Sequence, residues 1–206
     1  MTTKHIPPEW TFEFHGHKCP FMPLGYRMGK LALAYLGIEP EADHGFFIFP
    51  EIGEGHPQAC MMDGLQAATS ATYGKLLMAK TFYGKLAATF YHPQKGAVRY
   101  SLKPEFVDQF GQFEFFAYRK KGIEPSKIPA SAADEVIQWV YDQPDDNIFK
   151  VEPKPDFKFT QSKVHSTKPN VACAMNMCSN AISGSRKASR SAFPARVTSK
   201  KLYIQA

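Results

Sequence analysis

The sequence predicts an α+β protein in which a mixed or antiparallel sheet packs against helices. Segments with apolar residues at helical spacing occur beside short segments rich in aromatic and β-branched residues. These segments do not alternate in the regular order that builds a doubly wound parallel sheet. A hydrophobic content of 44% with 21% charged residues is typical of a globular chain, so a real core is expected.

The first predicted elements are a helix and a buried strand. Apolar side chains recur at helical spacing over residues 21–37, and Gly37 stands where a helix C-cap is expected. Residues 45–50 read Gly-Phe-Phe-Ile-Phe-Pro, an aromatic and β-branched run bounded by Gly and Pro that suits a short strand. A loop is expected over residues 51–57.

A second helix and a hairpin follow. The helix is predicted over residues 60–80, because apolar residues recur there, Asp63 stands early and Lys80 late, as the helix dipole favours. Two strands are predicted over residues 86–91 and 97–102, and the intervening His-Pro-Gln-Lys-Gly segment suits a hairpin connection.

The remaining chain divides into two more helices and a basic tail. A third helix is marked by phenylalanines and an alanine at helical spacing, and a fourth spans Ala133 to Tyr141. The residues that mark the third helix are Phe106, Phe110, Phe113, Phe116 and Ala117. The amino-acid composition changes near Glu152, after which Pro is frequent and apolar residues are few. We therefore expect a core domain over 1–153 and an appendage over 154–206, with ten Lys and Arg against one acidic residue.

Three metal-ligand side chains lie within five residues near the N-terminus. His15, His17 and Cys19 stand in the run Phe-His-Gly-His-Lys-Cys-Pro, and imidazole and thiolate are preferred ligands of zinc and similar late transition metals. Pro20 suits the first turn of the following helix, which places Cys19 at a helix N-terminus where the dipole favours thiolate. The alternative is that one histidine hydrogen-bonds a turn and the cysteine is simply buried.

Cys60 is placed in the same way as Cys19, at the start of a predicted helix and after a histidine, His56. If the two helix starts face one another, His17, Cys19 and Cys60 supply three ligands. The fourth position is then left for His15, His56, water or substrate. Cys60 and His17 are the residues expected to take part in any catalysis at this site.

Polar side chains that follow and precede Cys60 could support such a site. Asp63 and Gln66 lie one turn further along the helix, where they could orient ligands, contact a polar substrate or simply face solvent. Glu51 and Glu54 in the preceding loop offer a general acid or base.

Two further motifs fall short of a recognised site. Cys173 and Cys178 form a widened cysteine pair with His165 nearby, but no second Cys or His pair follows. The pair either binds metal with His165 and a ligand from elsewhere or is two free thiols. The Gly-Lys pairs at 74–75 and 84–85 lack the upstream glycine of a phosphate-binding loop, which excludes that class of nucleotide site.

The composition also bounds location and partners. The N-terminus lacks the apolar stretch of a signal peptide and no run approaches the roughly 20 apolar residues of a membrane span, so a cytoplasmic protein is expected, with its cysteines as thiols or ligands. The net charge of +6 comes from the tail, and nucleic-acid binding is not expected. Sheet edges and apolar helices favour a homodimer.

The order and spacing of these motifs resemble the FmdE family of formylmethanofuran dehydrogenase proteins over about residues 10–150. The likeness rests on four segments, which are Phe14 to Pro20, Pro23 to Gly29, Cys60 with Asp63 to Gln66, and Thr72 to Lys75. The resemblance implies an α+β core followed by an auxiliary treble-clef zinc finger. It implies that His15, His17, Cys19 and Cys60 form the shared core site, and that Cys173 and Cys178 correspond to the first half of the finger.

The chain departs from the family pattern at two places. The tail has one widened cysteine pair where the family's finger usually has two Cys-x-x-Cys pairs, so the appendage is an incomplete treble clef. Ser70 and Ala71 stand where the family commonly has Gly and Cys, which removes one thiol near the site.

Three classes of function are consistent with the sequence. The leading hypothesis is a metalloprotein that binds zinc or another divalent transition metal, and the resemblance implies a link to molybdenum or tungsten formylmethanofuran dehydrogenase and one-carbon metabolism. The second is a non-catalytic accessory protein that docks to a larger molybdenum or tungsten redox enzyme. The third is a thiol or haem-linked redox module, suggested by methionines near the cysteines, although Met at helical positions is more often packing.

Overall fold

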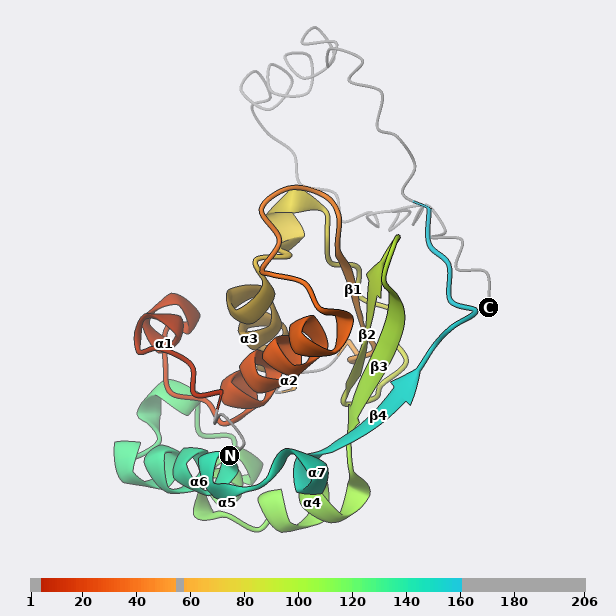
Figure 1. Ribbon diagram of the computed structural model, residues 1–206. Helices are drawn as coiled ribbons and strands as arrows, with labels where there is room; N and C mark the ends of the chain where they lie inside the picture. Colours follow the sequence, from red (N-terminus) through yellow and green to blue (C-terminus); the bar gives the residue numbers. More distant parts are fainter. Residues whose placement is uncertain (1–4, 55–57, 161–206) are drawn as a thin grey trace, which may run out of the picture. The chain divides into compact units, whose positions relative to one another are not determined.

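A four-stranded antiparallel sheet forms the centre of the protein. The structure is a computed structural model and describes residues 5–54 and 58–160. The strands are β1 (Phe47–Pro50), β2 (Ala87–His92), β3 (Gly96–Leu102) and β4 (Phe149–Pro153), and their order across the sheet follows the sequence (Figure 1). The α+β class with an antiparallel sheet is therefore confirmed.

Seven α-helices and two short 3₁₀ turns accompany the sheet in the described residues. The bounds are α1 (Trp10–His15), α2 (Phe21–Leu36), α3 (Cys60–Thr69), η1 (Tyr73–Lys75), α4 (Pro104–Phe110), α5 (Glu114–Lys120), η2 (Pro125–Lys127), α6 (Ala130–Asp142) and α7 (Asp145–Ile148). Helix α2 lies between the sheet and α3, while α4 to α7 gather at one end of the sheet (Figure 1).

The two faces of the sheet are covered differently. On the face that α2 covers, Tyr100 packs edge-on against Phe90 and its hydroxyl donates to the Leu31 carbonyl at 3.3 Å. On the other face, Phe49 meets Phe157 and Phe159 at centroid distances of 5.4 and 4.9 Å. The chain that follows β4 therefore contributes aromatic residues to the core as far as Phe159.

Helices α2 and α3 meet backbone to backbone at two glycines. A Cβ atom built on Gly25 would lie 1.9 Å from the Met61 carbonyl oxygen, and one built on Gly64 would lie 2.1 Å from that of Met22. Only glycine permits this approach. The contact lies within the first turns of both helices, so it brings their N-terminal ends together.

Most predicted elements are confirmed with small shifts. Helix α2 ends at Leu36 with Gly37 left-handed as its cap, and the predicted hairpin forms with Phe90 opposite Val98. Strand β1 begins two residues later than predicted, and α6 begins three residues earlier than the predicted fourth helix.

The predicted helix over 60–80 is wrong beyond Thr69. Ser70 takes a left-handed conformation at φ 58° and its N–H donates to the Gln66 carbonyl, which ends the helix. The apolar residues beyond it do not continue the helix. Met78 is buried beside β1, where it bridges in parallel to Ile48. Their spacing suited a helix, but they serve as a short extended segment at the edge of the sheet.

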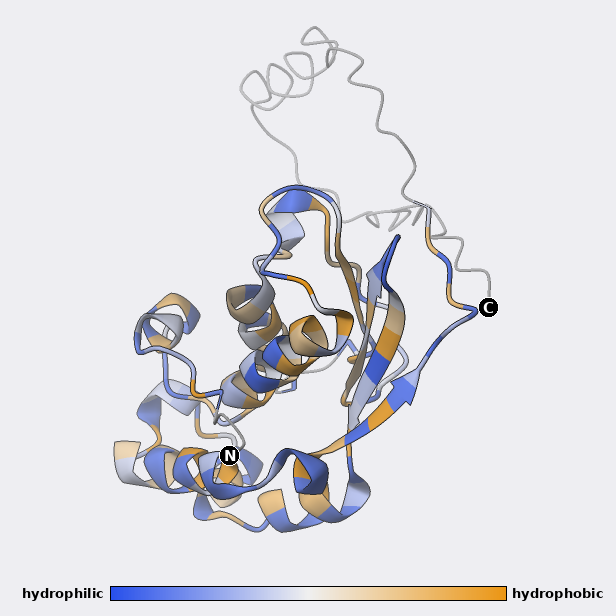
Figure 2. Ribbon diagram, viewed as in Figure 1, coloured by the Kyte–Doolittle hydropathy of each residue, from blue (hydrophilic) through white to orange (hydrophobic). Residues whose placement is uncertain are grey.

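The predicted third helix is two helices, and α1, α7, β4 and the two 3₁₀ turns were not predicted as separate elements. Residues 111–113 separate α4 from α5. Helix α1 is only six residues long. Strand β4 has five residues, in which the apolar Phe149 and Val151 alternate with the hydrophilic Lys150 and Glu152 (Figure 2). Both elements are too short for a periodic pattern to identify them.

Candidate metal centre

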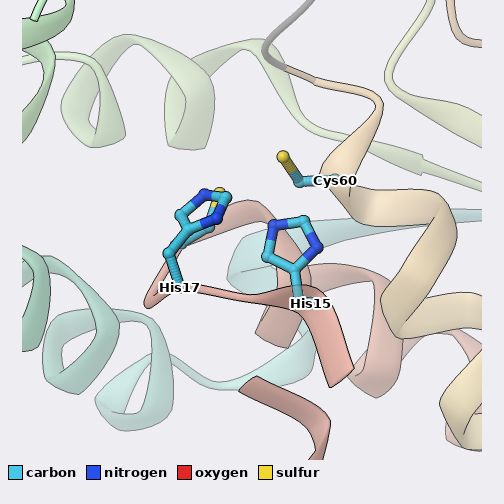
Figure 3. A group of neighbouring side chains, drawn as sticks. His15, His17 and Cys60 are labelled. Atoms are coloured by element: carbon cyan, nitrogen blue, oxygen red, sulfur yellow. The ribbon is translucent and has the colours of Figure 1, made fainter. Parts of the chain in front are cut away.

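Four predicted ligand side chains converge at the N-terminal ends of α2 and α3. One nitrogen of each of His15 and His17 and the sulfur of each of Cys19 and Cys60 all lie within 4.8 Å of one another. Figure 3 shows the two imidazoles side by side, with Cys60 on the neighbouring helix across from them. The two cysteines are buried and the histidines are partly buried.

The two histidines are brought together by a glycine turn. His15 is the last residue of α1, and Gly16 caps that helix at φ 86° with its N–H donating to the Phe12 and Glu13 carbonyls. The chain reverses there, and the His15 and His17 rings lie with centroids 4.4 Å apart. A residue with a Cβ rarely adopts this φ, so Gly16 is the natural residue for the turn.

The two cysteines are brought together by the helix contact. Cys19 stands two residues before α2 and Cys60 opens α3, so the close approach at Gly25 and Gly64 brings the two sulfurs within 4.8 Å of each other. The importance of these two glycines was not predicted. Glycines in the interior of an amphipathic helix are the signal for such a contact.

Burial and pairing with Cys60 oppose ionisation of the Cys19 thiol. The pKa of Cys19 is raised well above its usual value, first by the hydrogen bond with Cys60 and then by burial, while the backbone N–H groups of Phe21 and Met22 act in the opposite direction. The predicted helix-terminus effect is thus present but outweighed. Two buried thiols cannot both ionise without a nearby cation, and a coordinated metal ion supplies that charge.

His15 is oriented as metal-ligating histidines are. Its Nδ1 lies 2.7 Å from Asp63 Oδ2, and its pKa is raised to about 9 by that carboxylate and next by Cys60. The other nitrogen, Nε2, is hidden from solvent and has no hydrogen-bond partner of good geometry among the described residues. A ligand imidazole commonly donates one N–H to a carboxylate and binds metal with the other nitrogen. The donor set therefore fits a zinc-type ion.

Of the other polar candidate residues, Asp63 and Gln66 lie beside the site, whereas Glu51 and Glu54 do not take part in it. Asp63 contacts His15, and Gln66 donates to Asp63 Oδ1 at 3.2 Å. Glu51 is buried in a bidentate pair with Arg99, at 2.6 and 2.8 Å, so the carboxylate offered as an acid or base is engaged by that guanidinium. Glu54 is exposed.

Some predicted residues lie outside the described part of the chain. These are His56, His165, Cys173 and Cys178. The proposal of a second, finger-like metal site thus rests on the sequence alone.

One further contact at the site was not predicted. Lys18, between His17 and Cys19, pairs with Asp134 of α6 at 2.7 Å, which ties the turn to the helical end of the protein. Both side chains are about half exposed, so this tether contributes little stability.

The fold and the site define a small α+β protein with a buried pair of cysteines and a partly buried pair of histidines arranged for a metal ion. The sequence profile of the FmdE family, described as "Molybdenum formylmethanofuran dehydrogenase operon", matches residues 14–150. The chain belongs to the FmdE family.

Two individual proteins are similar to the chain. A "Probable S-adenosyl-L-methionine-binding protein" of Archaeoglobus fulgidus is 31% identical over 153 residues, covering 68% of this chain but 40% of the relative, so the chain spans less than half of that protein. A crystal structure of a tungsten formylmethanofuran dehydrogenase FmdE-like protein from Syntrophus aciditrophicus aligns with a TM-score of 0.48 and 20% identity, over 77% of this chain and 75% of that one.

Proposed function

We propose that this protein binds a zinc-type divalent ion through His15, His17, Cys19 and Cys60. The observation that carries the proposal is the convergence of two nitrogens and two sulfurs within 4.8 Å, from segments about 40 residues apart in the chain. Imidazole and thiolate together favour zinc over magnesium or calcium, which prefer oxygen ligands. Cys173 and Cys178 remain a proposed second pair of ligands.

In a catalytic version of this function, three side chains hold the ion and the fourth position takes water or substrate. A bound ion would supply Lewis acidity or activate water at that position. Asp63 fixes the His15 ring, so His15 is a constant member of the set. We propose Cys60 and His17 as the catalytic residues of this version, as ligands that would hold the ion at which water or substrate binds.

A non-catalytic accessory role is the second candidate, and the number of donors favours it. Four protein ligands complete the usual coordination of a structural zinc ion and leave no position for substrate. In this version the metal stabilises the junction of α1, α2 and α3, and the protein serves a larger enzyme.

The wider context is also a proposal. Family membership supports an association with formylmethanofuran dehydrogenase-type enzymes, a larger molybdenum or tungsten redox complex and one-carbon metabolism. Strand β4 forms one end of the sheet and Val151 on it is 42% exposed, which supports a homodimer. We propose a core domain and a basic appendage with the boundary near residue 153, where residues up to Phe159 still pack against the core sheet, and the cytoplasm as the location. None of the described helices has the length and apolar character needed to cross a bilayer.

Elemental analysis of the full chain, purified without chelator, tests the metal proposal. We expect about one equivalent of zinc at the core site, and loss of that equivalent in the Cys60→Ser and His17→Ala variants. His44→Ala is the matched control, because His44 is exposed and outside the cluster. Less than a tenth of an equivalent in the parent protein, or full retention in both variants, would overturn the proposal.

Cobalt substitution separates the catalytic and accessory versions. Cobalt in place of zinc gives visible absorption that reports its ligands, and an open position accepts azide or cyanide. A shift of the bands with added azide supports the catalytic version, whereas unchanged bands at saturating azide support the accessory one.

A further inference from the structure

Three hydrogen bonds connect the candidate metal centre to the turn that follows α3. His15 Nδ1 lies 2.7 Å from Asp63 Oδ2, Gln66 Nε2 donates to Asp63 Oδ1 at 3.2 Å, and the Tyr73 backbone N–H donates to Gln66 Oε1 at 2.9 Å. The chain of bonds crosses from α1 to α3 and then to the 3₁₀ turn η1. It is continuous, with Asp63 and Gln66 as its two inner members.

The direction of each bond follows from the one beyond it. A backbone N–H can only donate, so it fixes the carbonyl oxygen of the Gln66 amide toward Tyr73 and the NH₂ group toward Asp63. Both oxygens of the Asp63 carboxylate are then engaged as acceptors. The hydrogen of a neutral His15 therefore lies on Nδ1, which leaves Nε2 as the coordinating nitrogen.

The far end of this chain of bonds is anchored rather than loose. The turn η1 is closed by Thr72 Oγ1, which accepts from the Lys75 N–H at 3.3 Å. Lys75 Nζ in turn donates to the Glu41 carbonyl at 2.7 Å, which ties the turn to the segment before β1. The left-handed Ser70 returns the chain over Gln66, so the early end of α3 described above is what creates the link.

We propose that Gln66 is a positioning residue of the metal centre, acting through Asp63 on His15, and that the η1 turn is thereby coupled to metal affinity. This inference rests on the proposed metal site. Residues that orient a ligand histidine typically account for 10- to 100-fold in metal affinity when they are removed. Gln66 acts through Asp63 rather than as a ligand, because its amide donates to Asp63 and accepts from Tyr73.

The test measures zinc and cobalt affinity of the full chain against a competing chelator. Gln66→Met keeps the length of the side chain but removes both amide bonds, and we expect about a tenfold weaker affinity with a shifted cobalt absorption band. Gln138→Met is the matched control, because the Gln138 amide makes the same kind of bond to Asp142 on α6, at 3.1 and 3.2 Å, away from the cluster. It should leave affinity and spectrum unchanged.

A second pair of variants isolates the turn. Tyr73→Pro removes only the backbone donor and the ring, at the first position of η1, where proline is tolerated and Thr72 already has the extended conformation that precedes proline. Tyr73→Ala removes the ring but keeps the donor. We expect weaker metal binding for Tyr73→Pro and parent affinity for Tyr73→Ala.

The outcomes distinguish this inference from the proposed function. If the parent chain binds no metal, the proposed site is wrong and the positioning role falls with it. If the parent binds metal and Cys60→Ser does not, while Gln66→Met and Tyr73→Pro bind as the parent does, the site stands and the positioning role is overturned. In an Asp63→Asn background the effect of Gln66→Met should disappear, and a full further loss there would also overturn the role.

Discussion

The close contact between α2 and α3 predicts that Gly64→Ala destabilises the protein, although alanine has the higher helix propensity. Gly64→Ala places a Cβ atom 2.1 Å from the Met22 carbonyl oxygen and 2.6 Å from the Tyr26 nitrogen. Ordinary contact begins near 3.4 Å, so the helices must move apart by about 1.3 Å at this point. An unhindered Gly→Ala change inside a helix stabilises by about 1 kcal/mol, whereas overpacking of this kind costs about 1–3 kcal/mol or more.

We therefore expect Gly64→Ala to lower the free energy of unfolding by about 2 kcal/mol, measured by urea denaturation. Separation of the helix ends also spreads Cys19 from Cys60, and metal sites tolerate displacements of only about 0.5 Å, so zinc affinity should fall at least tenfold. Gly74→Ala is the control for the stability measurement, because its nearest contact is 4.0 Å away. A Gly64→Ala protein as stable as the parent, with unchanged zinc affinity, would refute the close contact as the cause of the site.

Three further predictions follow from the charged groups. The pKa of His15 is raised to about 9, so its protonated form stabilises the metal-free fold. This stabilisation is fully present below pH 6.5 and is lost as the pH rises through 9. The melting temperature should therefore fall over that range, and Asp63→Asn should make the fall smaller. Arg99→Met leaves the buried Glu51 carboxylate without its partner and should lower the free energy of unfolding, measured with urea, by about 3 kcal/mol. A decrease below about 1 kcal/mol would contradict this. Lys18→Ala removes an exposed pair and should change stability by less than about 1 kcal/mol; a larger loss would mean that the tether to α6 holds the turn.

Local residue chemistry predicted most of the candidate site. His15, Gly16, His17 and Cys19 lie within one short run, so their proximity follows from chain geometry. The placement of Cys60 opposite them was a hypothesis drawn from the similarity of the two helix starts, and the family resemblance implied it. The cause of that placement was not predicted, because the significance of Gly25 and Gly64 depends on which helices pack together.

The parts that were not predicted depend on long-range packing. The apolar residues after Thr69 keep a helical spacing, yet Met78 pairs with Ile48 beside the sheet, and local periodicity cannot reveal such a partner. Strand β4 has only two apolar residues, Phe149 and Val151, and is held by its register with β3, in which Tyr100 stands opposite Val151. Glu51 looked free in a loop because its partner, Arg99, lies 48 residues away.

The ligand set is the central claim, and X-ray absorption at the zinc edge tests it most directly. On the zinc-loaded full chain, we predict that the core site shows two sulfur neighbours at about 2.3 Å and two nitrogen neighbours at about 2.0–2.1 Å. Cys173→Ser combined with Cys178→Ser confines the measurement to the core site. A zinc shell without sulfur in that variant would contradict the assignment of Cys19 and Cys60 as ligands.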